Sequence, residues 1–221
     1  MKLLLVALTS LVSLAFASAA EPVKIACIGD SNTQESGGTS WPKYMQETLG
    51  TNYTVRNFGK SGTNGAKVGN PWRNTPLFAA SKDFAPDIVI WMHGTNDSTT
   101  WKKNNFAATY REDIKELLSQ YQALPSKPVI IIANSPSMFQ RDPAKIWGIN
   151  ADILDAEVIP AIADIAKDLG APMVDIHALT ANSEDGYVGP DGCHLADKGK
   201  KAVAEAIADA VKKASVKKEK E

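Results

Sequence analysis

Five short runs of mainly apolar or β-forming residues divide the chain, and polar or glycine-rich residues follow each of them. Runs of this length that are rich in Val, Ile, Tyr and Thr are typical of β-strands. The third run is apolar throughout after its first residue, as expected for a central parallel strand covered on both faces. The predicted strands cover Val23 to Ile28, Tyr53 to Asn57, Asp87 to Met92, Pro128 to Asn134 and Pro172 to Ile176.

Longer segments lie between these runs, and in them apolar residues recur at helical spacing. Tyr110, Ile114 and Leu117, for example, fall on one face of a helix. Strands that alternate with helices imply a parallel sheet with right-handed crossovers. We therefore predict a single three-layer α/β/α domain with a parallel sheet of about five strands. The predicted helices cover Trp41 to Leu49, Leu77 to Ser81, Phe106 to Leu124, Ala151 to Leu169 and Asp197 to Lys213.

The first twenty residues follow a different pattern. Lys2 precedes an almost wholly apolar stretch from Leu3 to Phe16, and small residues lead up to Ala20. This is the layout of a secretory signal peptide cleaved near Ala20, and the stretch is short for a membrane anchor. We expect an exported protein, secreted or periplasmic, with a domain over residues 21–213 and a charged, disordered tail over residues 214–221.

Charge and cysteine content narrow the function classes. The formal net charge is −1, and loss of Lys2 with the signal peptide makes it −2. No basic stripe indicates a nucleic-acid partner, and no later segment is apolar enough for stable membrane insertion. Cys27 lies inside a predicted strand and Cys193 in a late loop, so their placement does not favour a disulfide, which requires close Cα atoms.

A serine, a histidine and an aspartate are placed for nucleophilic catalysis. Ser31 follows the first strand, at the sheet edge where α/β proteins bind ligands. Asp191 precedes His194 by three residues and can orient its imidazole, which would then activate Ser31 as a nucleophile. Asp175 is an alternative acid, although it is distant in sequence. A solvated loop histidine beside a turn aspartate would give the same pattern, so this pair alone leaves both interpretations open.

Acyl transfer also needs hydrogen-bond donors for the negative oxygen that develops in the transition state. Three candidates follow successive predicted strands: the backbone N–H groups of Ser31 and Gly59, and the side-chain amide of Asn96. Each has a structural alternative, since glycine and asparagine are common in turns. Their joint placement favours an oxyanion hole.

Four segments together resemble the SGNH/GDSL hydrolase family, in particular its carbohydrate-esterase-like branch. They are Gly29-Asp30-Ser31-Asn32, Asn57-Phe58-Gly59, Gly94-Thr95-Asn96-Asp97 and Asp191-Gly192-Cys193-His194-Leu195, and they occur in the family's order. The resemblance implies a flavodoxin-like sheet and Ser31, Asp191 and His194 as catalytic triad. It also implies Ser31, Gly59 and Asn96 as oxyanion donors, with no cofactor and no metal.

Further residues are candidates for substrate binding. Asp30 belongs to the first of these segments and His93 directly precedes the third, and Trp72 and Trp101 follow strand ends, where they are placed to stack on a sugar ring. Packing is the equal alternative for both tryptophans. We interpret His177 as structural. Asp97 is expected to anchor the loop of Asn96 through backbone N–H groups.

The sequence thus predicts an exported serine esterase that removes short acyl groups, O-acetyl above all, from a carbohydrate such as an acetylated polysaccharide or sialic acid. A lysophospholipase or thioesterase of the same family is the alternative, with an acyl channel built by residues 135–149, which include Met138, Phe139 and Trp147. A carbohydrate-binding protein without catalysis is a further alternative. The sequence does not indicate an oligomeric state.

Overall fold

The computed structural model describes residues 21–102 and 106–218, so the predicted signal peptide lies outside the described residues. Five parallel strands form one sheet in the order β2-β1-β3-β4-β5. This is the flavodoxin-like strand order, and it confirms the predicted fold class. The strands are β1 (Val23–Gly29), β2 (Tyr53–Gly59), β3 (Ile88–Met92), β4 (Val129–Ala133) and β5 (Met173–Val174).

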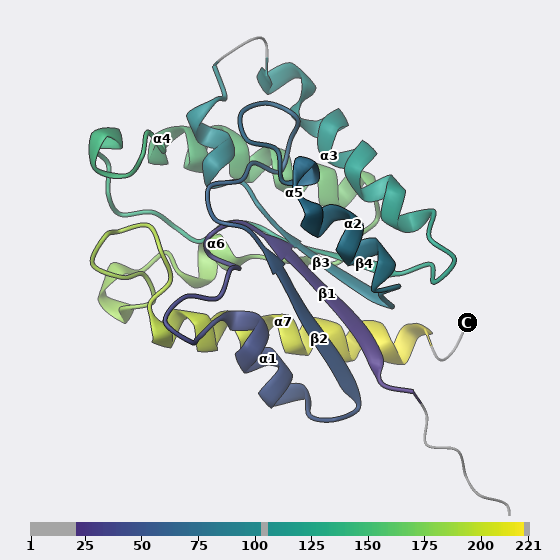
Figure 1. Cartoon of the computed structure of the whole chain (residues 1–221). Coiled ribbons are helices and arrows are strands. Elements are labelled where there is room, and N and C mark those ends of the chain that lie inside the picture. Colours follow the sequence, from purple (N-terminus) through teal and green to yellow (C-terminus); the bar gives the residue numbers. More distant parts are fainter. Residues whose placement is uncertain (1–20, 103–105, 219–221) are drawn as a thin grey trace, which may run out of the picture.

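Helices cover both faces of the sheet (Figure 1). On β1, Ile25 and Cys27 face α1 (Trp41–Leu49) and α7 (Asp197–Lys218), whereas Ala26 and Ile28 belong to the core on the opposite face. That second core includes α2 (Pro76–Asp83), α3 (Phe106–Gln122) and α5 (Ile159–Asp168). Buried on both faces, β3 is the central strand that its continuous apolar run predicts.

The two cysteines lie in different cores. Cys27 packs between the sheet and the α1/α7 layer, and Cys193 packs in the core of the opposite face. Both thiols are free and buried. The separation by the sheet explains why they do not form a disulfide.

Two predicted elements differ from the structure for local reasons. The segment predicted as one helix from Ala151 divides into α4 (Ala151–Ile153), a π-helical turn η4 (Leu154–Val158) and α5. Pro160, at the start of α5, has no N–H for a regular helical bond, and the π-turn accommodates it. The last strand is short because Asp175 caps α6 (Ile176–Leu179) directly after it.

The C-terminal helix is longer than predicted. α7 continues to Lys218, so residues 214–218 are helical and not part of a disordered tail. Residues 219–221 lie outside the described residues. Within the described part of the chain, no helix is long and apolar enough to cross a membrane.

The segments that follow the strands gather at the carboxyl edge of the sheet, and short helical turns shape those after β2, β3, β4 and β5. These turns are η1 (Trp72–Asn74), η2 (Asn96–Thr99), η3 (Pro143–Lys145) and η5 (Ser183–Asp185). With this strand order, the chain reverses its direction of winding between β1 and β3, and ligands bind at such a switch point. Ser31 lies two residues beyond β1, at this point.

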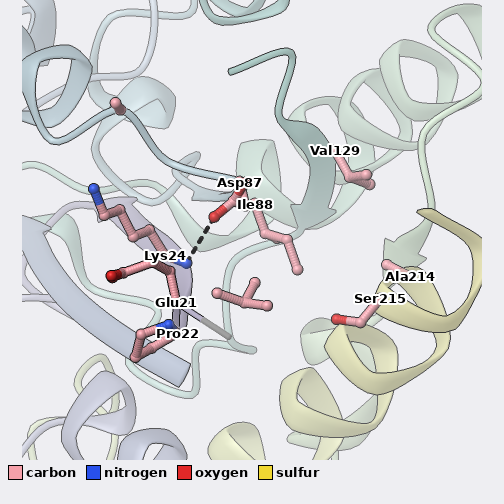
Figure 2. A pocket seen from close by; sticks show the side chains of 10 residues that line it. Glu21, Pro22, Lys24, Asp87, Ile88, Val129, Ala214 and Ser215 are labelled. Carbon is pink, nitrogen blue, oxygen red and sulfur yellow. Dashed lines mark hydrogen bonds between the residues drawn. The ribbon is translucent and has the colours of Figure 1, made fainter. Parts of the chain in front are cut away.

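A cavity of about 550 Å³ lies at the opposite, amino edge of the sheet (Figure 2). Lys24, Ile88 and Val129 line it from the starts of three strands, and the backbone N–H of Lys24 donates to Asp87 Oδ2 at 3.0 Å. None of the predicted catalytic residues lines this cavity. The predicted catalytic residues therefore lie away from this cavity, at the carboxyl edge.

Candidate active site

The structure brings Ser31, His194 and Asp191 together in one hydrogen-bonded row. Nε2 of His194 lies 3.0 Å from Ser31 Oγ, and Nδ1 lies 2.7 Å from Asp191 Oδ2. Ser31 comes from the turn after β1, while the other two come from the loop before α7, more than 150 residues later. This is the geometry in which a carboxylate orients an imidazole and the imidazole removes a proton from a serine.

The turn that carries His194 is built by Asp191 itself. Asp191 Oδ1 accepts hydrogen bonds from the backbone N–H groups of Cys193 and His194, each at 3.0 Å, and Oδ2 remains for the imidazole. Burial would raise the pKa of Asp191, but these backbone and imidazole donors outweigh it and lower the pKa. The carboxylate is therefore ionised when it faces the imidazole.

Asn32 fastens the loop of His194 to the turn after β1 that carries Ser31. Its Oδ1 accepts the backbone N–H of Leu195 at 2.9 Å, and its Nδ2 donates to the carbonyl of Cys193 at 3.4 Å. These partners are the residues on either side of His194, so one buried amide fixes the histidine backbone relative to Ser31. In the sequence, the only signal for this role of Asn32 is that a polar residue directly follows the serine.

Two predicted oxyanion donors have N–H groups to offer. The backbone N–H of Ser31 makes no hydrogen bond within the described part of the chain. Asn96 begins η2, and its Nδ2 donates one hydrogen to the carbonyl of Thr63 at 3.1 Å. An amide nitrogen carries two hydrogens, so the second remains for a ligand.

Gly59 does not match its prediction. Its N–H already donates to Asn57 Oδ1 at 2.8 Å, and an added Cβ would lie 2.4 Å from the backbone nitrogen of Gln34. Glycine is needed at this position because the end of β2 closely approaches the backbone of Thr33 and Gln34, in the turn after Ser31. Gly59 therefore has a structural role at the end of β2 and does not offer its N–H to an oxyanion.

Gly62, three residues later, has the unpaired backbone N–H that Gly59 lacks among the described residues. It is exposed, has a φ of 73°, and its N–H has no hydrogen-bond partner among the described residues. Ser61 on one side lines the hollow beside Ser31, and the carbonyl of Thr63 on the other side binds Asn96. Gly62 thus lies between two residues that contact the site.

Three predicted substrate-binding side chains are buried, and their predictions have to be corrected. Trp72 donates from its indole to the carbonyl of Phe58 at 2.8 Å, and the indole of Trp101 binds Glu157. His93 is fully buried with its ring near those of Trp72 and Trp91, and this burial lowers its pKa to about 3. The loops after β2 and β3 fold back over the sheet, so their aromatic residues complete the core.

Asp30 is also buried and does not face a substrate. Its Oδ1 accepts the N–H of Asn32 at 2.9 Å, and its Oδ2 has no partner among the described residues. Burial raises its pKa to about 7, and the nearby carboxylate of Asp97 contributes in the same direction. Through the bond to Asn32, Asp30 shapes the turn that carries Ser31.

Asp97 anchors the loop of Asn96, as predicted from the sequence. Its two carboxylate oxygens accept the backbone N–H groups of Gly65 and Ala66 at 3.0 and 3.1 Å. Burial raises its pKa to about 6 despite these donors. The bonds join the loop after β3 to the glycine-rich loop after β2.

The alternative acid and the remaining histidine have structural positions. Asp175 accepts the N–H of Ala178 at 2.9 Å at the start of α6, and the side chain of Asn134 donates to it at 2.8 Å. His177 lies 3.5 Å from Asp155. Asp175 is therefore engaged as a helix cap, away from His194.

A hollow of about 260 Å³ opens beside the triad. Its lining is polar apart from one leucine, and it comprises Ser31, Asn32, Gln34, Glu35, Ser36, Ser61, His194, Leu195 and Lys200. Beyond His194, the indole of Trp147 lies edge-on to the imidazole, with ring centroids 5.7 Å apart. The site is thus a small polar hollow with one aromatic side chain at the histidine side.

Comparison with known proteins identifies the family. Residues 27–202 match the GDSL-like lipase/acylhydrolase family. An acetylxylan esterase from Xylanibacter ruminicola is 30% identical over an alignment of 217 residues that covers 87% of this chain and 44% of that protein. The chain therefore spans less than half the length of this relative.

Solved structures share the fold. A carbohydrate acetylesterase family member from Sinorhizobium meliloti superposes with a TM-score of 0.66 at 21% identity, over 86% of this chain and 97% of that one. The native aryl esterase of M. smegmatis gives 0.63 at 17% identity, over 87% and 99%. With the family match over most of its length and this fold, the chain belongs to the GDSL-like lipase/acylhydrolase family of carboxylic ester hydrolases.

Proposed function

We propose that the chain is an exported serine esterase that removes acetyl groups from a carbohydrate. The observation that carries this proposal is the position of His194, whose Nε2 lies 3.0 Å from Ser31 Oγ while Asp191 holds its Nδ1 at 2.7 Å. A serine hydroxyl becomes nucleophilic when an oriented base removes its proton. Export is supported by the signal-peptide pattern of residues 1–20.

In the proposed mechanism, Ser31 Oγ attacks the ester carbonyl carbon and His194 takes its proton. The negative oxygen of the tetrahedral intermediate accepts hydrogen bonds from the backbone of Ser31, from Asn96 and from the backbone of Gly62. His194 then donates the proton to the leaving alcohol, and an acetyl-serine remains. Water, deprotonated by the same imidazole, attacks this ester, and acetate leaves as Ser31 recovers its proton.

The shape of the site supports a short acyl group. The hollow beside Ser31 has about 260 Å³ and one apolar lining residue, Leu195. A long acyl chain requires an apolar channel, and residues 135–149 were the predicted source of one. Of the three side chains named for it, Met138 packs in the core with Ile146 and Ile149, Phe139 lines a separate hollow, and Trp147 extends into solvent, so the three do not enclose a channel. This favours the acetylesterase over the lysophospholipase or thioesterase alternative.

The carrier is proposed to be a polysaccharide. The relative from Xylanibacter ruminicola is described as acting on acetylxylan, and the S. meliloti structure as a carbohydrate acetylesterase. The hydroxyl, amide and charged groups around Ser31 are suited to the polar atoms of a sugar next to the acetyl group that enters the hollow. An acetylated xylan is therefore the first candidate substrate.

The test is to measure acetate release from acetylated xylo-oligosaccharides alongside hydrolysis of p-nitrophenyl acetate and octanoate. We expect turnover of the acetylated sugar and a preference for acetate over octanoate. A preference for octanoate would contradict the acetylesterase assignment and support the lipid or thioester alternative. Binding of the oligosaccharide with no hydrolysis of any ester would support the non-catalytic alternative.

A further inference from the structure

Trp147 is the large apolar side chain that the fold leaves in solvent. It is 73% exposed, and no other large hydrophobic residue of the described chain is comparably exposed. The other four tryptophans are at most 4% exposed. Exposing an indole forgoes the hydrophobic stabilisation that burial would give and leaves its apolar face available to a ligand.

The backbone around Trp147 directs this side chain outwards. Its φ is 57°, a left-handed conformation that is unfavourable for a bulky residue. On either side, Ile146 and Ile149 are buried, and the N–H of Gly148 donates to the carbonyl of Pro143 at 2.8 Å. The turn is thus fixed by packing and hydrogen bonds, and strained residues held in this way gather at functional sites.

The exposed indole borders the catalytic histidine on a defined side. Its ring centroid lies 5.7 Å from that of His194 with the planes at 67°, and it is not part of the lining of the hollow beside Ser31. In the proposed mechanism, His194 protonates the leaving alcohol, so the alcohol part of the ester must lie against His194. Trp147 is therefore placed to contact the alcohol part, not the acyl group.

We propose that Trp147 is the platform for the sugar ring of the leaving alcohol. A pyranose ring has flat C–H faces and polar edges, and an exposed indole offers a matching apolar plane beside a polar hollow. Trp147 is then a specificity-determining residue for the carrier. This inference rests on the proposed function, because it takes the ester to be one of a sugar.

The experiment compares two acetate esters that differ in the alcohol: acetylated xylotriose and ethyl acetate, whose alcohol is too small to span His194 and the indole. We expect Trp147→Ala to lower the ratio of kcat/KM for the sugar ester over ethyl acetate by about tenfold or more, mainly through KM. Trp147→Phe should restore part of the ratio. Lys145→Ala, an exposed position in the same loop, is the matched control and should leave the ratio unchanged.

A binding measurement tests the contact without turnover. In Ser31→Ala protein, acrylamide quenching of tryptophan fluorescence reports mainly on Trp147, because the other tryptophans are buried. We expect xylotriose to reduce the quenching, and Trp147→Phe in the same background to abolish this protection. Unchanged quenching at saturating xylotriose would overturn the proposal.

The kinetic outcomes separate the two proposals. If Trp147→Ala lowers kcat/KM equally for both esters, the indole only supports His194. If it lowers kcat/KM for neither ester, the indole has no role. Either result overturns the platform while wild-type turnover of the sugar ester keeps the proposed function intact. If the wild type hydrolyses ethyl acetate but not acetylated xylotriose, the proposed carrier fails and the platform with it.

Discussion

The substitution Asp30→Asn should change how the stability of this protein depends on pH. Asp30 directly precedes Ser31 and is buried, with Oδ2 unpaired among the described residues. Burial and the nearby Asp97 raise its pKa from 3.8 to about 7. Asparagine retains an oxygen for the N–H of Asn32 but removes the ionisation, so the variant isolates the cost of the buried charge.

The sign and size of the effect follow from linkage. Below pH 3.8 the carboxyl group of Asp30 is protonated in both states, so it costs nothing. Between this value and pH 7 the unfolded chain ionises while the folded protein keeps its proton, and stability falls as pH rises. A shift of about three pKa units corresponds to a loss of about 4 kcal/mol that is complete above pH 7.

The assay is urea unfolding followed by tryptophan fluorescence at several values from pH 4 to 8. Relative to the wild type, Asp30→Asn should gain stability as pH rises, up to about 4 kcal/mol at pH 8. Asp83→Asn, which changes an exposed carboxyl group, is the control and should show no such gain. A stability difference between Asp30→Asn and wild type that stays constant over this range would refute the reasoning.

Three further substitutions test the site. Asn32→Ala leaves the N–H of Leu195 and the carbonyl of Cys193 unpaired, which costs about 1–3 kcal/mol for each group. Tm and kcat should therefore both fall. An unchanged kcat would show that the Asn32 side chain does not position His194. Asn96→Ala should lower kcat about 10²–10³-fold with little change in KM, and a change confined to KM would assign the amide to ground-state binding. Asp191→Asn should lower kcat on p-nitrophenyl acetate by about 10³–10⁴-fold, and a loss below tenfold would exclude it as the orienting acid.

The fold and the hydrogen-bonded row of Ser31, His194 and Asp191 were accessible from the sequence because both leave local signals. Apolar runs that alternate with helical segments specify a parallel sheet, and its carboxyl edge then gathers the residues after each strand. The spacing of Asp191 and His194 places the two in one turn, where the carboxylate also caps the backbone. Ser31 needed only its position after β1.

The remaining features depend on which groups the loops bury, and this is a tertiary property. Trp72 and Trp101 lie beyond strand ends, but the loops return them to the core, whereas Trp147 is exposed by a turn anchored on two isoleucines. Gly59 ends β2 and Gly62 lies three residues later in the glycine-rich loop; the bond from the Gly59 N–H to an asparagine side chain leaves Gly62, of these two, with the N–H that has no partner among the described residues. No spacing rule contains this information.

The central claim, that Ser31 carries the acyl group, is tested most directly by trapping the intermediate. Protein mixed with p-nitrophenyl acetate is quenched in acid during turnover, and the mass of its peptides is measured. We expect one acetyl group on the peptide of Ser31, absent in Ser31→Ala and retained in Ser61→Ala, which alters the same hollow. Turnover by Ser31→Ala close to the wild-type rate, or an acetyl group on a different residue, would contradict the account.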